Sequence, residues 1–389
     1  MEVKLNKLVF AYDGHFIKLP NKNIVSKGGF PSEVWERYLS ISEELIVQAR
    51  IFNGADNRAS GVISNHENVS FKELPNLSSI KGALTKRNKC RQSIEDELKH
   101  SDLLVARLPS EIGLVAISVA KKLNKPYVVE VVGDAFEALF HLNSLFYKCY
   151  SFIFSYRNKQ AIMGAAGAIY VTNYYLQRRY PCLGITGVAS NVELDVSNVI
   201  EWNPRKGNVF GLIGTLEVAY KGVDVVIKAI SLLKNRGVIC QLRIIGEGKY
   251  KKNYQAMSKK YDVEELVFFD GGGKSKDEVY RWIDDLDFYI QPSKTEGLPR
   301  ALIEAMSRKK VCIGSNVGGI PELLAEDYIF ESKNWKSLSA KMESVINMDI
   351  QEYKNEAEVN YEKARMFDSR ELDLKRACFW EEIHKSVAQ

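Results

Sequence analysis

Short apolar runs alternate with helical patterns along the first half of the chain. The runs lie at 4–11, 45–52, 102–106, 127–132 and 168–171, and each has the length of a buried strand. The segment 111–123 carries apolar residues near helical spacing, ends in Lys121-Lys122 and is followed by Pro126, which indicates a helix that leads into a strand. Strands that alternate with helices predict a mostly parallel sheet covered on both faces.

The same alternation restarts after a polar stretch at 195–207 that contains Asn203-Pro204. We therefore predict an α/β protein with two doubly wound domains, at 1–194 and 208–366, joined by a linker at 195–207. A helical segment at 367–389 follows, with Leu372, Lys375, Phe379 and Ile383 near one face. Two such sheets with facing carboxyl ends would form a ligand-binding cleft between the domains.

Composition and charge narrow the class of protein. The 389 residues are 46% hydrophobic and 26% charged, which is typical of a folded globular protein. The net charge of +5 is a mild excess, unlike the basic stripe of a nucleic-acid binder, so we expect no nucleic-acid partner. The six cysteines are well separated, and the N-terminus lacks the apolar core of a signal peptide, so we expect a cytoplasmic location. No apolar run reaches ~18 residues, so we expect no transmembrane helix.

The strongest candidate chemistry lies at 291–306, where a loop meets the start of a helix. Gly297 lets the backbone approach a ligand, Pro299 suits the first turn of a helix, and free amides at a helix start can hold phosphate oxygens. Glu296 lies in the loop and Glu304 eight residues later, and carboxylates accept hydrogen bonds from sugar hydroxyls. Each glutamate alone is also typical of a helix-start acid or a solvated helix face. Together they indicate a nucleotide sugar as the ligand.

The spacing of Glu296 and Glu304, framed by Pro292-Ser293 and Ala305-Met306, resembles the signature of the retaining glycosyltransferases of family 4. The resemblance extends over 211–224, with Lys221-Gly222, and over 267–271 and 318–322. The matching motifs lie close together over roughly residues 207–330, and few of them lie in the first half of the chain. The resemblance implies the GT-B fold, in which two Rossmann-like domains face an interdomain cleft and a C-terminal helix crosses back onto the first domain.

The resemblance also implies roles for single residues. It places Glu296 on the donor sugar, Glu304 on the ribose hydroxyls and Lys221 on the donor diphosphate. Many relatives have an arginine where this chain has Thr215, so we expect Lys294 or Arg300 to supply the missing charge. The full set of implied donor-binding residues is Gly28, Gly29, Thr215, Gly246, Gly271, Lys294, Gly297, Leu298, Pro299, Arg300 and Glu304.

Asp134, which follows a buried strand, is the third candidate catalytic residue beside Glu296 and Lys221. Many relatives carry a histidine near this place, and none of the histidines of this chain is an obvious substitute. The position at a strand end favours a carboxylate that faces the sugar. The residue type equally favours an N-cap for a helix at 135–140, and both interpretations stay open.

The tract 141–159 combines aromatic and basic residues, which is typical either of a buried helix or of a helix that lies on an anionic membrane. The segment 175–181 resembles bacterial capsule and O-antigen polysaccharide transferases, which implies a lipid-linked saccharide acceptor at the inner membrane face. We therefore expect a retaining, metal-independent glycosyltransferase that needs no cofactor besides its nucleotide-diphosphate sugar. The alternatives are a GT-B-fold phosphorylase or sugar epimerase, and a noncatalytic sugar-binding subunit.

Overall fold

The computed structural model describes residues 4–26, 29–54, 61–77, 79, 82, 85–142, 144–192, 194, 202 and 207–388. The chain divides into two compact units, which we call unit 1 (1–191 with 373–389) and unit 2 (192–372). The linker predicted at 195–207 lies outside the described residues, apart from Trp202 and Gly207. No helix within the described ranges is long and apolar enough to cross a membrane.

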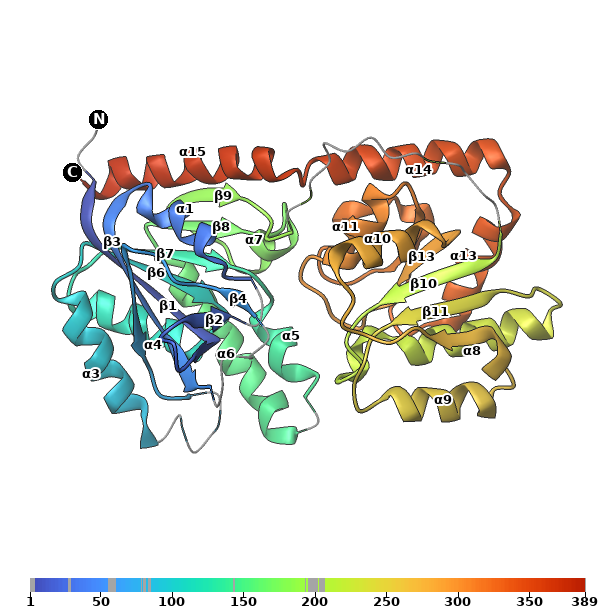
Figure 1. Cartoon of the computed structure of the whole chain (residues 1–389), viewed down its shortest axis with the longest axis horizontal. Helices are drawn as coiled ribbons and strands as arrows, with labels where there is room; N and C mark the ends of the chain where they lie inside the picture. The colour runs from blue at the N-terminus through green and yellow to red at the C-terminus, as the bar shows by residue number, and fades with distance from the viewer. Residues whose placement is uncertain are drawn as a thin grey trace. The chain divides into compact units, whose positions relative to one another are not determined.

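Unit 1 is built on one sheet with the strand order β4-β2-β1-β6-β7-β8-β9, with β3 beside β1 and β5 beside β3 (Figure 1). All the pairings are parallel except those of the short strands β2 and β4, which are antiparallel. The strands are β1 (Leu5–Lys18), β2 (Ile24–Ser26), β3 (Ser42–Asn53), β4 (Val62–Ile63), β5 (Val69–Glu73), β6 (Leu103–Leu108), β7 (Tyr127–Val131), β8 (Gly167–Tyr170) and β9 (Ile185–Val188).

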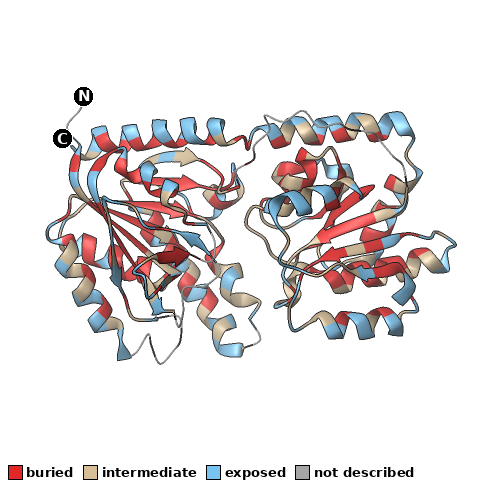
Figure 2. Ribbon diagram, in the orientation of Figure 1, coloured by how far each residue is buried: buried red, intermediate tan, exposed pale blue. Residues whose placement is uncertain are grey.

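Helices cover both faces of this sheet. Its helices are α1 (Glu36–Leu39), α3 (Arg87–Leu98), α4 (Glu111–Lys122), α5 (Ala135–Phe140), α6 (Leu145–Met163), α7 (Tyr175–Arg179) and α15 (Ser369–Val387). The C-terminal helix α15 packs on unit 1, because Phe379, Trp380 and Ile383 are buried in the same apolar core as Tyr38 and β1. The outer side of α15 stays exposed (Figure 2).

Unit 2 is built on an all-parallel sheet with the order β12-β11-β10-β13-β14-β15. Its strands are β10 (Val209–Ile213), β11 (Gln241–Ile245), β12 (Val267–Phe269), β13 (Phe288–Gln291), β14 (Val311–Ser315) and β15 (Ile329–Phe330). One core packs α8 and α13 against the sheet, and a second core packs α10 and α11 against it. The helices are α8 (Val223–Asn235), α9 (Lys251–Lys260), α10 (Lys276–Asp284), α11 (Arg300–Ser307), α12 (Ile320–Leu323), α13 (Trp335–Asn347) and α14 (Ile350–Arg365).

The predicted fold class of two doubly wound α/β sheets with a returning C-terminal helix is confirmed. One local prediction is wrong, because strand β1 continues to Lys18 instead of ending near residue 11. Val34, Tyr38, Ile41 and Leu45 have helical spacing in the sequence, but α1 ends at Leu39 and β3 begins at Ser42. Arg376 and His384 are buried polar residues of α15, and the guanidinium of Arg376 donates to the carbonyl of Ser190. Lys375, next to Arg376, is exposed.

Candidate active site

The predicted donor residues of unit 2 lie in the loops at the carboxyl edge of its parallel sheet. The strand order reverses between β10 and β13, because β11 and β12 lie on one side of β10 and β14 and β15 lie beyond β13. Ligands of doubly wound sheets bind at such a switch point, outside the carboxyl ends of the strands. The loops 214–222 and 292–299 leave β10 and β13 there, and the backbone of Lys294 donates to the carbonyl of Tyr220 at 2.7 Å.

Glycines let these loops approach each other closely. A Cβ atom on Gly222, whose φ is +77°, would lie 1.9 Å from the carbonyl oxygen of Pro292. A Cβ on Gly246 would lie 2.0 Å from the carbonyl oxygen of Gly214, and one on Gly318 would lie 1.9 Å from that of Glu296. Larger residues would push the loops apart. The positions of Gly222, Gly246 and Gly318 therefore bring four loops into backbone contact at this edge.

Lys221 and Glu296 form an ion pair across the switch point, with 2.8 Å between Nζ and Oε2. Ser293 Oγ donates to the same oxygen at 3.0 Å, and Gln291 Nε2 donates to it at 3.3 Å. Oxygen Oε2 is thus fixed by three donors. Oε1 accepts no hydrogen bond from a residue that the structure describes, which leaves it for a ligand.

Glu304 lies on α11, half-buried, and its carboxylate accepts no hydrogen bond within the described parts of the chain. Burial raises the pKa of Glu304, although the cations of Arg300 and Lys276 work in the opposite direction. Burial is the main cause that raises the pKa of Tyr289, and the charges of Glu304 and Glu296 raise it further, so both carboxylates lie near this phenol. A half-buried carboxylate without a partner needs an external donor to offset its desolvation.

The remaining predicted donor residues have the following surroundings. Lys294 donates to both oxygens of Asp224 at 2.8 and 2.9 Å, so its charge is neutralised within unit 2. Thr215 is exposed and its hydroxyl accepts from the amide of Glu217. Gly271 has a positive φ, and its carbonyl oxygen accepts from the amide of Gly246. The carbonyl oxygen of Gly297 accepts from the amide of Gly319. Leu298 is half-buried, Pro299 lies at the N-cap position of α11, and Arg300 is exposed.

In unit 1, Asp134 is the N-cap of α5, the second of its two predicted roles. Oδ1 accepts from the amides of Phe136 and Glu137 and from Tyr180, and Oδ2 accepts from Tyr175 and Arg179 at 2.7 and 2.6 Å. The side chain is 1% exposed. A contact between Asp134 and a sugar would require one of these five donors to leave. Gly29 is exposed with a φ of +88°, and Gly28 lies outside the described residues.

The sequence interpretation missed several residues that position this site. Tyr289, Gln291 and Ser293 connect the end of β10 to Glu296 through hydrogen bonds, and Asp224 binds Lys294. Gln291 and Ser293 lie inside the segment 291–306, and both donate to Glu296, which is 5 and 3 residues away. The conformation of the loop determines these two hydrogen bonds. No group of three or more His, Cys, Asp or Glu side chains that could hold a metal occurs among the described residues.

Comparison with known proteins assigns the family. The sequence pattern described as "Glycosyl transferases group 1" matches residues 200–365. Protein CapJ of Staphylococcus aureus is 38% identical over 331 residues, which cover 83% of this chain and 81% of CapJ. This chain belongs to the group 1 glycosyltransferases. The group corresponds to family 4, a retaining family, and the predicted family is thereby confirmed.

Two further similarities place this glycosyltransferase among relatives. The putative colanic acid biosynthesis glycosyltransferase WcaL of Escherichia coli K12 is 30% identical over 141 residues, which are 34% of either chain. The crystal structure of Anabaena HepE in complex with UDP-glucose superposes with a TM-score of 0.64, covering 97% of this chain and 99% of that chain at 16% identity. The likeness to HepE is one of fold alone. The chain is thus a group 1 glycosyltransferase related to enzymes of bacterial polysaccharide synthesis.

Proposed function

We propose that this glycosyltransferase moves a hexosyl or related sugar from a nucleotide-diphosphate donor in unit 2 to a saccharide acceptor in unit 1, with retention and without a metal. The observation that carries the proposal is the set of carboxylates at the switch point of unit 2. Glu304 accepts no hydrogen bond from a described residue, and Glu296 keeps one oxygen beside Lys221 that no described donor binds. The bound UDP-glucose of HepE, which shares the fold, supports a UDP-sugar as the first donor to test.

Each of these groups has a defined task in the transfer. Glu304 accepts hydrogen bonds from the ribose hydroxyls, and Glu296 Oε1 accepts from a hydroxyl of the donor sugar. When the bond between the anomeric carbon and the diphosphate breaks, negative charge develops on the phosphate, and the ammonium of Lys221 stabilises it. The acceptor oxygen forms the new bond on the same face of the sugar and passes its proton to the departing phosphate. Arg300 stays a proposed phosphate contact, and Asp134 positions α5 and Tyr175.

We further propose that the acceptor is lipid-linked and that α6 contacts the membrane. Apolar side chains project into solvent along one face of α6, at spacings of three, four and seven residues. We call this face the outer stripe of α6; it consists of Leu145, Phe146, Phe152, Ile153 and Tyr156, which are 78%, 47%, 63%, 56% and 65% exposed. Lys148 and Lys159 are exposed on the same helix. Apolar stripes flanked by lysines are typical of helices that lie on anionic membranes.

The decisive experiment is a panel of UDP-, GDP-, ADP- and dTDP-sugars read by thermal shift and by release of the nucleoside diphosphate. We expect one donor to raise the melting temperature in the wild type and to do so much less in Glu304→Ala. Absence of any shift with the whole panel would overturn the donor assignment.

The membrane contact has a separate test. We expect sedimentation with anionic vesicles at low salt, which high salt weakens, because each lysine near the surface contributes about 1 kcal/mol. Arg157, which the sequence also suggested for this role, is paired with Glu111 and is not counted. Equal and negligible sedimentation with anionic and neutral vesicles would remove the outer stripe of α6 from the membrane.

A further inference from the structure

A cavity of about 450 Å³ lies wholly within unit 1, at the carboxyl ends of its parallel strands. Its volume is in the range of small-molecule binding sites. The residues that line it come from β1 and β3, from the segments that follow β5 and β6, and from helices α3, α4, α5 and α6; they include Asp13, Arg50, Arg87, Glu111, Leu139 and Phe154. The strand order of unit 1 reverses between β1 and β6, so the cavity occupies the switch point of this sheet.

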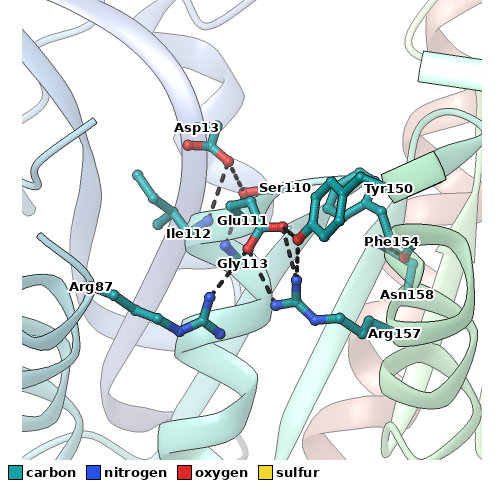
Figure 3. Close-up of polar contacts among 10 residues, drawn as sticks. All are labelled: Asp13, Arg87, Ser110, Glu111, Ile112, Gly113, Tyr150, Phe154, Arg157 and Asn158. Carbon is teal, nitrogen blue, oxygen red and sulfur yellow. Dashed lines mark hydrogen bonds and ion pairs between the residues drawn. The ribbon is translucent and has the colours of Figure 1, made fainter. Parts of the chain in front are cut away.

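Each of the three described arginines around the cavity, Arg50, Arg87 and Arg157, has an acceptor in unit 1. Glu111 is bound by Arg157 at 2.9 and 3.2 Å, by the hydroxyl of Tyr150, and by Arg87 at 3.5 Å (Figure 3). Oδ2 of Asp13 accepts from Ser110 and from the amide of Ile112, and its Oδ1 is buried without a hydrogen bond from a described residue. Arg50 donates to the carbonyl oxygen of Asp13. Most of the other lining residues are apolar or aromatic. The lining therefore favours a ligand whose surface is mostly apolar.

Helix α6 connects the cavity to the exterior. Its inner side supplies Tyr147, Tyr150 and the buried Phe154 to the cavity wall, and its opposite side carries the outer stripe of α6. Phe146 belongs to both, since it lines the cavity and is half exposed. The apolar wall of the cavity is thus continuous with an exposed apolar surface. A hydrocarbon chain could pass from that surface into the cavity without crossing a polar barrier.

We infer that this cavity binds the hydrocarbon chain of the acceptor lipid. The inference rests on the proposed function, because it assumes that the acceptor saccharide is attached to a lipid. Leu77, Leu139 and the aromatic residues of α6 enclose the chain next to the attached saccharide. Unit 1 would then select its acceptor by the lipid as well as by the sugar. No covalent step takes place in the cavity.

The test measures whether farnesol, a neutral isoprenoid alcohol, displaces the fluorescent dye Nile red from the wild-type protein, which we expect it to do. We expect Leu139→Trp, which fills the cavity, to weaken farnesol binding at least tenfold. The matched control is Leu183→Trp, at an 82% exposed position of unit 1 that does not line the cavity, which should bind as the wild type does. Should Leu139→Trp fail to fold by circular dichroism, Ala138→Trp on the same helix gives the answer, because Ala138 is exposed beside the cavity.

Two comparisons separate this inference from the proposed function and from simple membrane contact. UDP affinity should be unchanged in the cavity variants, and Ile153→Ser with Tyr156→Ser should abolish vesicle binding while farnesol still binds. Wild-type protein that binds UDP but not farnesol would overturn the cavity inference and leave the donor site intact. Cavity variants that take up farnesol as the wild type does would overturn it as well. Wild-type protein that binds farnesol but not UDP would contradict the proposed function.

Discussion

Replacing Glu304 with Gln should weaken UDP binding and stabilise the free protein at the same time. In the free enzyme the carboxylate is half-buried without a hydrogen-bond donor among the described residues, and this desolvation raises its pKa. Hydrogen bonds to a charged group contribute about 1.5 to 3 kcal/mol, so loss of one such bond from a ribose hydroxyl should weaken binding roughly 10- to 100-fold. Isothermal titration calorimetry with UDP measures this loss directly.

The pH dependence of UDP affinity and of protein stability tests the same role of the Glu304 carboxylate. A raised pKa in the folded state means that the unfolded chain binds fewer protons at mildly acidic pH, so the stability of the wild type falls as pH rises through the folded pKa. Glu304→Gln lacks this loss and should unfold at a higher temperature than the wild type at pH 8, with the difference vanishing near pH 4. UDP affinity of the wild type relative to the variant should fall on acidification, because protonation removes the charged acceptor.

The control for these measurements is Glu264→Gln, which changes an exposed glutamate of unit 2 by the same atoms. It should alter neither UDP affinity nor the unfolding temperature. The use of a ratio between variant and wild type cancels the titration of the UDP phosphate itself. Identical affinities for Glu304→Gln and wild type between pH 5 and 8 would refute the assignment of Glu304 to the ribose.

Three further predictions concern unit 2. Glu296→Gln should slow sugar transfer at least tenfold while UDP affinity changes little, because the proposed mechanism places Oε1 of Glu296 on the donor sugar. Wild-type turnover of the variant in steady-state kinetics with the best donor would contradict this. Gly222→Ala should cost more stability in urea unfolding than Gly237→Ala, and should weaken UDP binding, because both have a φ near +80° but only Gly222 faces a carbonyl oxygen at 1.9 Å. Burial lowers the pKa of Lys310 to about 8. The free energy of unfolding of the wild type, relative to that of Lys310→Met, should therefore rise by roughly 2 kcal/mol between pH 8 and 10. A difference that does not change with pH would contradict the lowered pKa.

The fold was largely predictable because its signals are local. Lys121 and Lys122 lie in the last turn of α4, and Pro126 precedes β7, as the pattern indicates. The continuation of β1 to Lys18 could not be predicted, because the polar pair Asp13-Gly14 is typical of a turn. The strand persists there through a register shift against β3, between Ala11 and His15.

The candidate site was predictable in its residues but not in their pairing. The motif at 291–306 identifies Glu296 and Glu304, and its Gly297 and Pro299 predict a loop followed by a helix. The ion pair between Lys221 and Glu296 joins residues 75 positions apart, and that between Lys294 and Asp224 joins residues 70 apart. Such pairs follow from the strand order alone, which brings the loops after β10 and β13 together. For Asp134 the sequence left a cap and a sugar contact open, and the structure shows the cap.

The ion pairs within unit 2 are compatible with folding of the free protein and with the proposed binding of an anionic donor. An unpaired lysine beside buried loops would destabilise the free protein, whereas Lys221 bound to Glu296 is neutralised. Both side chains remain partly exposed, so the pair contributes little net stability and Lys221 can also approach a diphosphate. The shape of the site therefore depends on the glycine contacts between loops more than on the charges. Substitutions that remove charge should leave unit 2 folded, and substitutions at Gly222, Gly246 or Gly318 should not leave the site intact.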